Sequence, residues 1–109
     1  MTLRNPSVPR MVEEIRPDED RVRVVGTIKT VLGPNDFTLE DATGTVNVTV
    51  SEEMDPLQVS LIRERMVVRV HGTVVVAMDG GQKISADLVQ EFSRVDMELY
   101  QKVRMVANF

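Results

Sequence analysis

Apolar and polar residues alternate over several short runs between residues 21 and 91. The clearest run is residues 45–51, in which Val46, Val48 and Val50 alternate with threonine, asparagine and serine. A period of two is typical of a β-strand with one face in a core and the other in solvent. Four other runs are rich in β-branched residues and are bounded by turn residues. The pattern predicts five strands, over residues 21–32, 37–40, 45–51, 66–78 and 82–91.

The segment that joins the second and third runs is the most informative part of the chain. Its sequence is Leu39-Glu40-Asp41-Ala42-Thr43-Gly44-Thr45-Val46, an acidic turn that ends in glycine. Such a turn between two amphipathic runs predicts the hairpin of a small barrel. Adjacent carboxylates can also serve acid-base catalysis, but turn preference and solvation account for Glu40 and Asp41.

Two of the runs contain a central glycine. At Gly26 the alternation slips by one residue, from Val24 to Val25, and then resumes with Ile28. A slip at a glycine indicates a β-bulge, which would bend the first strand so that it serves two sides of a barrel. In the last run we expect three residues to face inward: Ile84, Ala86 and Leu88.

Three segments depart from the strand period. Residues 1–20 contain three prolines, which block helix propagation, and we interpret them as a partly ordered N-terminal arm. Residues 52–64 break the alternation at Pro56 and predict a short helix or loop between the third and fourth strands. The barrel then occupies residues 21–92, and residues 93–109 form a C-terminal amphipathic helix.

The C-terminal helix has a clear start and one apolar stripe. Ser93 can cap it together with Asp96, and Phe92 can pack on Met97. The stripe can cover the open end of the barrel or meet helices of a partner. We favour the second role because the valines of the strands already fill the barrel core. The candidate oligomerisation residues are Val95, Leu99, Val103 and Val106.

These elements resemble a known family. The first and fourth strands carry similar glycine-centred runs, Val22-Arg23-Val24-Val25-Gly26-Thr27-Ile28 and Val68-Arg69-Val70-His71-Gly72-Thr73-Val74, and the acidic hairpin lies between them. Over residues 21–108 the pattern is similar to the OB domain of the middle-sized subunits of replication protein A and of small archaeal single-stranded-DNA-binding proteins. The fold class is then all-β, a five-stranded OB-fold barrel with a short helical insertion between strands 3 and 4 and a C-terminal α-helix.

The resemblance implies single-strand binding across the second and third strands and the loops after the first and fourth. It also implies that the terminal helix joins sister subunits in a helical bundle. The chain departs from the family where that family has stacking aromatics, at Ser51 and near Ala77. Since stacking contributes about 1 to 3 kcal/mol per base in such grooves, we expect weak or subunit-assisted binding.

Composition narrows the functions that fit this fold. The 109 residues suffice for one domain and carry a net charge of −4, which disfavours strong nonspecific binding to nucleic acid. A nucleic-acid role must therefore rest on a local basic patch. The chain has no cysteine, and no apolar run approaches the roughly 20 residues of a membrane span. We therefore expect an intracellular protein, cytoplasmic or nucleoid-associated, with no membrane partner.

We expect neither catalysis nor a cofactor. His71 is the only histidine, and no cysteine or carboxylate stands at metal-ligand spacing from it. No nucleophile, base and orienting group can be assembled from the sequence. Phe37 shares its strand face with Leu39, so we interpret it as a core residue rather than a base-stacking platform.

Several outward-facing residues are candidates for contacts to nucleic acid. Basic side chains gathered beside hydrogen-bonding side chains would form the positive groove that single strands require. Outward charges on strands also serve solvation and edge protection, so only their clustering is informative. The candidates are Lys29, Asn47, Thr49, Arg69 and Lys83.

Two hypotheses follow, with a third kept open. The first is a single-stranded-DNA-binding OB-fold subunit of a replication protein A-like complex, with other OB-fold subunits or a second copy bound through the C-terminal helix. The alternative is an OB-fold subunit with a structural or protein-interaction role and little nucleic-acid binding of its own. The third is a tRNA-binding or other RNA-binding OB domain, which stays open because no residue pattern here addresses the 2′-hydroxyl.

Overall fold

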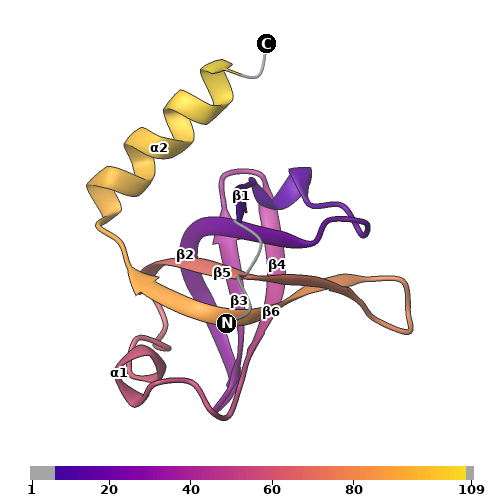
Figure 1. The fold of residues 1–109 in the computed structure, drawn as a ribbon. Coiled ribbons are helices and arrows are strands. Elements are labelled where there is room, and N and C mark those ends of the chain that lie inside the picture. The colour runs from indigo at the N-terminus through magenta and orange to yellow at the C-terminus, as the bar shows by residue number, and fades with distance from the viewer. Residues whose placement is uncertain (1–6, 108–109) are drawn as a thin grey trace, which may run out of the picture.

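A closed barrel of five strands forms the centre of the molecule (Figure 1). The computed structural model describes residues 7–107, and their side chains as far as Val103. The barrel strands are β2 (Arg21–Gly33), β3 (Asp36–Asp41), β4 (Gly44–Val50), β5 (Val67–Val76) and β6 (Gln82–Glu91). Their order around the barrel is β2-β3-β4-β6-β5, and β5 closes it by pairing with β2. Within the barrel, β4 and β6 run parallel and the other pairs are antiparallel. This order confirms the predicted OB-fold barrel.

The inward side chains of the barrel strands form one apolar core. Val46, Val48 and Val50 of β4 are buried, as their alternation predicts, whereas Asn47 between them is exposed. Phe37 is fully buried, which confirms it as a core residue. The other core residues with no exposed surface are Val22, Val24, Ile28, Leu39, Val68, Val70 and Ile84.

The carboxylate of Asp41 holds the turn between β3 and β4. Its Oδ1 accepts hydrogen bonds from the backbone N–H of Thr43 at 2.7 Å and of Gly44 at 3.2 Å, and from the Thr43 hydroxyl at 2.7 Å. Its Oδ2 accepts a hydrogen bond from the backbone N–H of Val12 at 2.7 Å. The acidic turn therefore anchors the N-terminal arm as well as the hairpin.

The described part of the arm packs along the barrel. β1 (Val8–Pro9) pairs in parallel with the start of β2, and the 3-10 helix η1 (Val12–Glu14) follows it. Met11 and Ile15, on either side of η1, are buried. The sequence did not predict β1, because two residues are too few to show an alternation.

The bulge in β2 lies at a different residue from the predicted one. β2 pairs with β5 without interruption past Gly26, and the first register shift, against β3, leaves Lys29 as the extra residue. The prediction of a bulge at Gly26 is therefore wrong. Val25 interrupts the alternation because its side chain is buried outside the barrel, under helix α2 (Arg94–Ala107). Gly26 is needed for close packing, since a Cβ there would lie 2.5 Å from the Glu40 carbonyl oxygen.

A further bulge lies in β6. Opposite the consecutive residues His71 and Gly72 of β5, β6 contains one extra residue, Asp87. The inward phase of β6 consequently moves by one position after Asp87, so that Val89 is buried and Leu88 is only half-buried. The prediction that Leu88 faces inward is therefore wrong.

Two α-helices in the described part of the chain lie outside the barrel. The first, α1 (Pro56–Val59), is the short insertion expected between the third and fourth barrel strands. Its Gln58 Oε1 accepts a hydrogen bond at 2.8 Å from the backbone N–H of Val89, which fixes α1 to the edge of β6. The second, α2, is capped as predicted, because Ser93 Oγ accepts a hydrogen bond at 3.0 Å from the backbone N–H of Asp96.

α2 contacts the barrel near its start and then points away from it (Figure 1). Met97 is buried against Val25 of β2 and Val67 of β5, and Phe92 and Tyr100 pack beside these residues. Among the helices of residues 7–107, none is long and apolar enough to cross a membrane.

The predicted apolar stripe of α2 lies away from this contact. Val95 is 74% exposed, Leu99 is 61% exposed and Val103 is 59% exposed. Val106, the fourth predicted member, lies outside the described side chains. The stripe is therefore not part of the barrel core.

Candidate nucleic-acid interface

A row of outward side chains crosses β3, β4, β6 and β5. The strand register places Thr38 opposite Asn47, Asn47 beside Lys83, and Lys83 opposite Val75. Residues that are directly paired project from the same side of a sheet. The Thr38 hydroxyl donates a hydrogen bond to Asn47 Oδ1 at 3.2 Å. Two of the predicted site residues, Asn47 and Lys83, are thus neighbours.

A second row runs alongside the first. It contains Asp36 of β3, Thr49 of β4 and Ser85 of β6. The Thr49 hydroxyl donates a hydrogen bond to Asp36 Oδ1 at 2.7 Å. Since Thr49 is two positions from Asn47 on β4, both side chains lie on one face. We call the surface formed by Thr38, Asn47, Thr49, Lys83 and Ser85 the polar face.

Positive and negative charges are balanced around the polar face. Lys29 lies at its β2 margin, and its Nζ is 3.7 Å from Glu40 Oε2. Both side chains are exposed, so this ion pair is weak. Within residues 7–103, Lys83 forms no ion pair. Lys83 is therefore the cation of the polar face that remains available to a ligand.

The described aromatic side chains lie elsewhere. Phe37 is in the core, and Phe92 and Tyr100 lie where α2 contacts the barrel. Exposed apolar side chains also occur near the polar face, for example on the β5–β6 hairpin, where Val76 is 50% exposed and Met78 is fully exposed. Val76 is exposed because this hairpin extends beyond the barrel, as Figure 1 shows.

Arg69 is separated from the other predicted site residues. It lies on β5 opposite Val25 of β2, and its Nε donates a hydrogen bond to Gln90 Oε1 at 3.0 Å. Its guanidinium carbon is 5.6 Å from the centre of the Phe92 ring, a cation–π contact. Arg69 therefore belongs to a different surface, which we call the arginine wall: Arg21, Arg23, Arg69 and His71.

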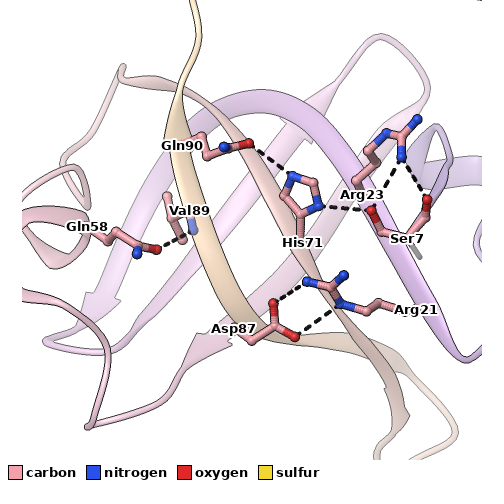
Figure 2. A network of polar contacts seen from close by, with 8 residues as sticks. All are labelled: Ser7, Arg21, Arg23, Gln58, His71, Asp87, Val89 and Gln90. Atoms are coloured by element: carbon pink, nitrogen blue, oxygen red, sulfur yellow. Dashed lines mark hydrogen bonds and ion pairs between the residues drawn. The ribbon is translucent and has the colours of Figure 1, made fainter. Parts of the chain in front are cut away.

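His71 sits at the centre of the arginine wall (Figure 2). One ring nitrogen, Nδ1, is 2.9 Å from Ser7 Oγ, and the other, Nε2, is 3.0 Å from Gln90 Oε1. Because an amide oxygen only accepts, Nε2 carries the hydrogen and Nδ1 of the neutral ring accepts from Ser7. Burial lowers the pKa of His71 below 6.5, the charges of Arg69, Arg21 and Arg23 lower it further, and the hydrogen bond to Gln90 opposes them.

The remaining arginines of the wall are held by the chain around them. Arg21 forms a bidentate pair with Asp87, with Nη2 2.6 Å from Oδ1 and Nε 3.2 Å from Oδ2. Arg23 donates from Nη1 to the Ser7 carbonyl oxygen at 2.7 Å. The sequence alone does not reveal this cluster, because the cluster depends on the β2–β5 pairing that closes the barrel.

A family model described as an OB-fold nucleic acid binding domain matches residues 22–92, the whole barrel. The chain belongs to this family. Among curated protein sequences, none matches the chain.

Solved structures share this OB-fold at low sequence identity. Asparaginyl-tRNA synthetase from Pyrococcus horikoshii gives a TM-score of 0.62 at 21% identity, over 77% of this chain and 23% of the synthetase chain. The OB-fold chain thus spans less than a quarter of that protein. A chain of a replication protein A heterotrimer bound to ssDNA gives a TM-score of 0.61 at 18% identity, over 78% of this chain and 67% of that one. A chain of the S. pombe Stn1–Ten1 complex gives a TM-score of 0.68 at 14% identity, over 91% of this chain and 89% of that one.

Proposed function

We propose that this OB-fold protein binds single-stranded nucleic acid, DNA in the first instance, on its polar face, as one subunit of a replication protein A-like assembly. The observation that carries the proposal is the pairing of Asn47 with Lys83 at the centre of a row of hydrogen-bonding side chains. The family match supports nucleic-acid binding in general. The likeness to a chain of a heterotrimer bound to ssDNA supports DNA as the first ligand to test.

Each part of the polar face has a chemical role in this proposal. Lys83 neutralises a backbone phosphate, the contact that supplies most of the salt-dependent affinity. Asn47 and Thr49 offer amide and hydroxyl groups to base edges and to phosphate or sugar oxygens. Lys29 supplies a second cation at the margin when a phosphate displaces Glu40 from it. Affinity stays modest because aromatic stacking, worth about 1 to 3 kcal/mol per base, is missing from the polar face.

Assembly through α2 is the second half of the proposal. Val95, Leu99 and Val103 form an exposed apolar stripe on a helix that points away from the barrel. Their spacing of four residues places them along one side of the helix, where they can pack against another helix. Other OB-fold subunits, or a second copy of the chain, would cover the stripe, and Val106 would extend it.

A second candidate function is supported by the charge balance of the polar face. Glu40 lies 3.7 Å from Lys29, and Asp36 stands beside Thr49. These carboxylates, on a face where no described aromatic side chain lies, favour an OB-fold subunit that makes protein contacts and binds nucleic acid little by itself. RNA in place of DNA is a variant of the first function.

The test of the first function is a fluorescence anisotropy titration with labelled oligo-dT and oligo-rU. We expect affinity to fall steeply between about 50 and 200 mM salt, and Lys83→Gln to reduce the salt slope by about 0.7, the value for one lost phosphate contact. Lys102→Gln, an exposed lysine on α2, is the matched control. No binding of either strand at low salt would contradict the first function and support the second. Tighter binding of oligo-rU would make RNA the ligand.

Assembly is tested by light scattering on Leu99→Asp and Val103→Asp. We expect both to lower the oligomeric mass while the circular dichroism of the barrel persists. Glu98→Gln, on the same helix, should change neither. If the oligomeric mass is unchanged in both aspartate variants, the stripe does not mediate assembly and the assembly proposal is wrong. A monomeric wild type would exclude a second copy and leave other OB-fold subunits as the partner.

A further inference from the structure

The arginine wall is a compact arrangement of cationic side chains. Arg21 and Arg23 are two positions apart on β2, Arg69 and His71 are two positions apart on β5, and Arg23 pairs directly with His71. Positions two apart on a strand share a face, and paired positions project together. The four side chains therefore leave the barrel on the same outer side, as Figure 2 shows for Arg21, Arg23 and His71.

The wall is positive in a protein whose net charge is −4. Among residues 7–103, Asp87 is the carboxylate that forms an ion pair with an arginine of the wall. Arg23 and Arg69 have neutral partners instead, the carbonyl oxygen of Ser7 and the amide oxygen of Gln90. Among residues 7–103, Arg23 and Arg69 thus have no carboxylate partner, so an anion is the ligand that complements this surface.

A row of hydroxyl side chains connects the wall to the polar face. The register pairs Thr49 of β4 with Ser85 of β6, Ser85 with Thr73 of β5, and Thr73 with Arg21 of β2. Ser85 and Thr73 are exposed. Neighbouring strands are about 4.8 Å apart, so the row extends roughly 15 Å around the barrel. Hydroxyl groups hydrogen-bond phosphate oxygens, and this row is therefore a continuous polar path between the two surfaces.

We propose that the arginine wall binds the backbone phosphates of a single strand that leaves the polar face along Thr49, Ser85 and Thr73. The proposal rests on the proposed nucleic-acid function and extends it to a second surface. Arginine contacts to phosphate add affinity and fix the position of the strand without selecting its sequence. The strand gains phosphate contacts on the wall where the polar face offers no stacking ring.

The guanidinium groups are already positioned for this role. Arg23 is held through Nη1 by Ser7, and Arg69 is held through Nε by Gln90 and lies over the Phe92 ring. A guanidinium has five N–H donors, so both arginines keep donors for a phosphate beyond the contacts made within residues 7–103. Side chains held in this way lose little conformational entropy on binding.

The experiment compares a short and a long oligo-dT, of about 4 and about 16 nucleotides, the range of site sizes for one OB fold. The double variant Arg23→Gln/Arg69→Gln should bind the long strand roughly 10-fold more weakly, with a salt slope reduced by about 1.4. Its affinity for the short strand should match the wild type. Lys83→Gln should weaken the binding of both strands, because both occupy the polar face.

Three further variants control for charge and folding. Asp87→Asn removes the paired carboxylate of the wall and should tighten long-strand binding about 3-fold, because the wall becomes more positive by one charge. Arg23→Lys/Arg69→Lys keeps the charge and should keep most of the salt slope. Arg16→Gln/Arg63→Gln removes the same charge from exposed sites off the wall and should match the wild type. Circular dichroism and thermal unfolding establish that each variant is folded.

The outcomes separate the two proposals. The proposal for the wall is wrong if long-strand affinity is unchanged in Arg23→Gln/Arg69→Gln and in Asp87→Asn. If Lys83→Gln weakens binding in the same experiment, the proposal for the polar face stands. Equal losses in the Arg16/Arg63 control would also overturn the wall, since total charge would then explain the effect. Binding that depends on Arg23 and Arg69 but not on Lys83 would support the wall and contradict the polar face. If the wild type binds neither strand, both nucleic-acid proposals are wrong. If a poly-glutamate peptide binds the wild type but not the double variant, the wall is a protein-docking surface.

Discussion

The polar face and the arginine wall lie on the same barrel but differ in charge: positive and negative groups are balanced on the polar face, whereas positive groups predominate on the wall. On the polar face Lys29 lies beside Glu40, and on the wall three arginines surround one histidine. Asn47 and Lys83 meet through the parallel β4–β6 pair, whereas Arg23 and His71 meet through the β2–β5 pair that closes the barrel. Long-range strand pairing, rather than local sequence, therefore determines which charged side chains become neighbours.

The largest effect should come from Gly72, which lies next to the bulge that separates the two surfaces. A Cβ at this position would be 2.3 Å from the Ser85 carbonyl oxygen and 2.8 Å from Ile84 Cγ2. Gly72→Ala should therefore lower the free energy of unfolding by about 3 kcal/mol, measured by urea denaturation. Gly33→Ala is the control, because its Cβ would meet Asp36 Oδ2 at an ordinary 3.8 Å. A Gly72→Ala protein as stable as Gly33→Ala would show that β5 and β6 can move apart here without cost.

The next effect concerns Asp41, which ties the arm to the barrel and so helps to place Ser7 on the wall. Asp41→Ala leaves the backbone N–H groups of Val12, Thr43 and Gly44 without their acceptor and should destabilise the protein by about 2 kcal/mol. Asp41→Asn keeps one acceptor oxygen and should lower the free energy of unfolding by less than Asp41→Ala does. Native-state hydrogen exchange should show faster exchange at Val12 in both variants. Slow exchange there would mean that the arm is held by other contacts.

A smaller effect should separate the ion pairs of the two surfaces. Arg21 pairs with Asp87 in bidentate geometry, which raises the pKa of Arg21, and its side chain is 15% exposed. Asp87→Ala should cost about 1 kcal/mol, because it leaves a half-buried guanidinium without its carboxylate. Glu40→Ala on the polar face should cost less than about 0.5 kcal/mol, since both members of that pair are exposed. Equal values in thermal unfolding would remove this distinction between the surfaces.

The smallest expected effect is a pH dependence at His71. Its folded-state pKa lies below 6.5, so the unfolded chain takes up the proton more readily than the folded protein. The contribution of His71 to stability is therefore complete above about pH 6.5 and is lost as the pH falls toward the folded pKa. His71→Gln should flatten this part of the stability profile between about pH 7.5 and 5, measured against the wild type by urea denaturation. If the stability profiles of the wild type and His71→Gln are parallel, folding does not change the pKa of His71.

The strand pattern was predictable from the sequence, and so was the start of α2. Alternation places Val46, Val48 and Val50 inward because a strand has a period of two and one face must be buried. Ser93 and Asp96 are close in sequence, so their cap is a local property. The predicted stripe of α2 is exposed at Val95, Leu99 and Val103, but its binding partner remains a prediction.

The wall and the bulges could not be predicted because they depend on contacts between distant residues. His71 meets Ser7 across a separation of 64 residues, and no local pattern records this contact. Val25 looked like a slip in the alternation because its cover, Met97, comes from a helix far along the chain. Of the predicted binding residues, Asn47, Thr49 and Lys83 gather on the polar face, Lys29 lies at its margin and Arg69 lies on the wall. Their roles in binding remain predictions.

The bulge at Asp87 has a consequence for redesign of this scaffold. Before Asp87, the odd-numbered residues Lys83 and Ser85 of β6 point outward, and after it the even-numbered Gln90 does. A single strand therefore contributes to both surfaces with opposite parity, and a mutagenesis library can vary one surface without altering the other. Deleting Asp87 would remove the bulge and make the alternation regular along β6: Val89 would stay inward and Gln90 outward, while Arg21 would lose the carboxylate with which it pairs.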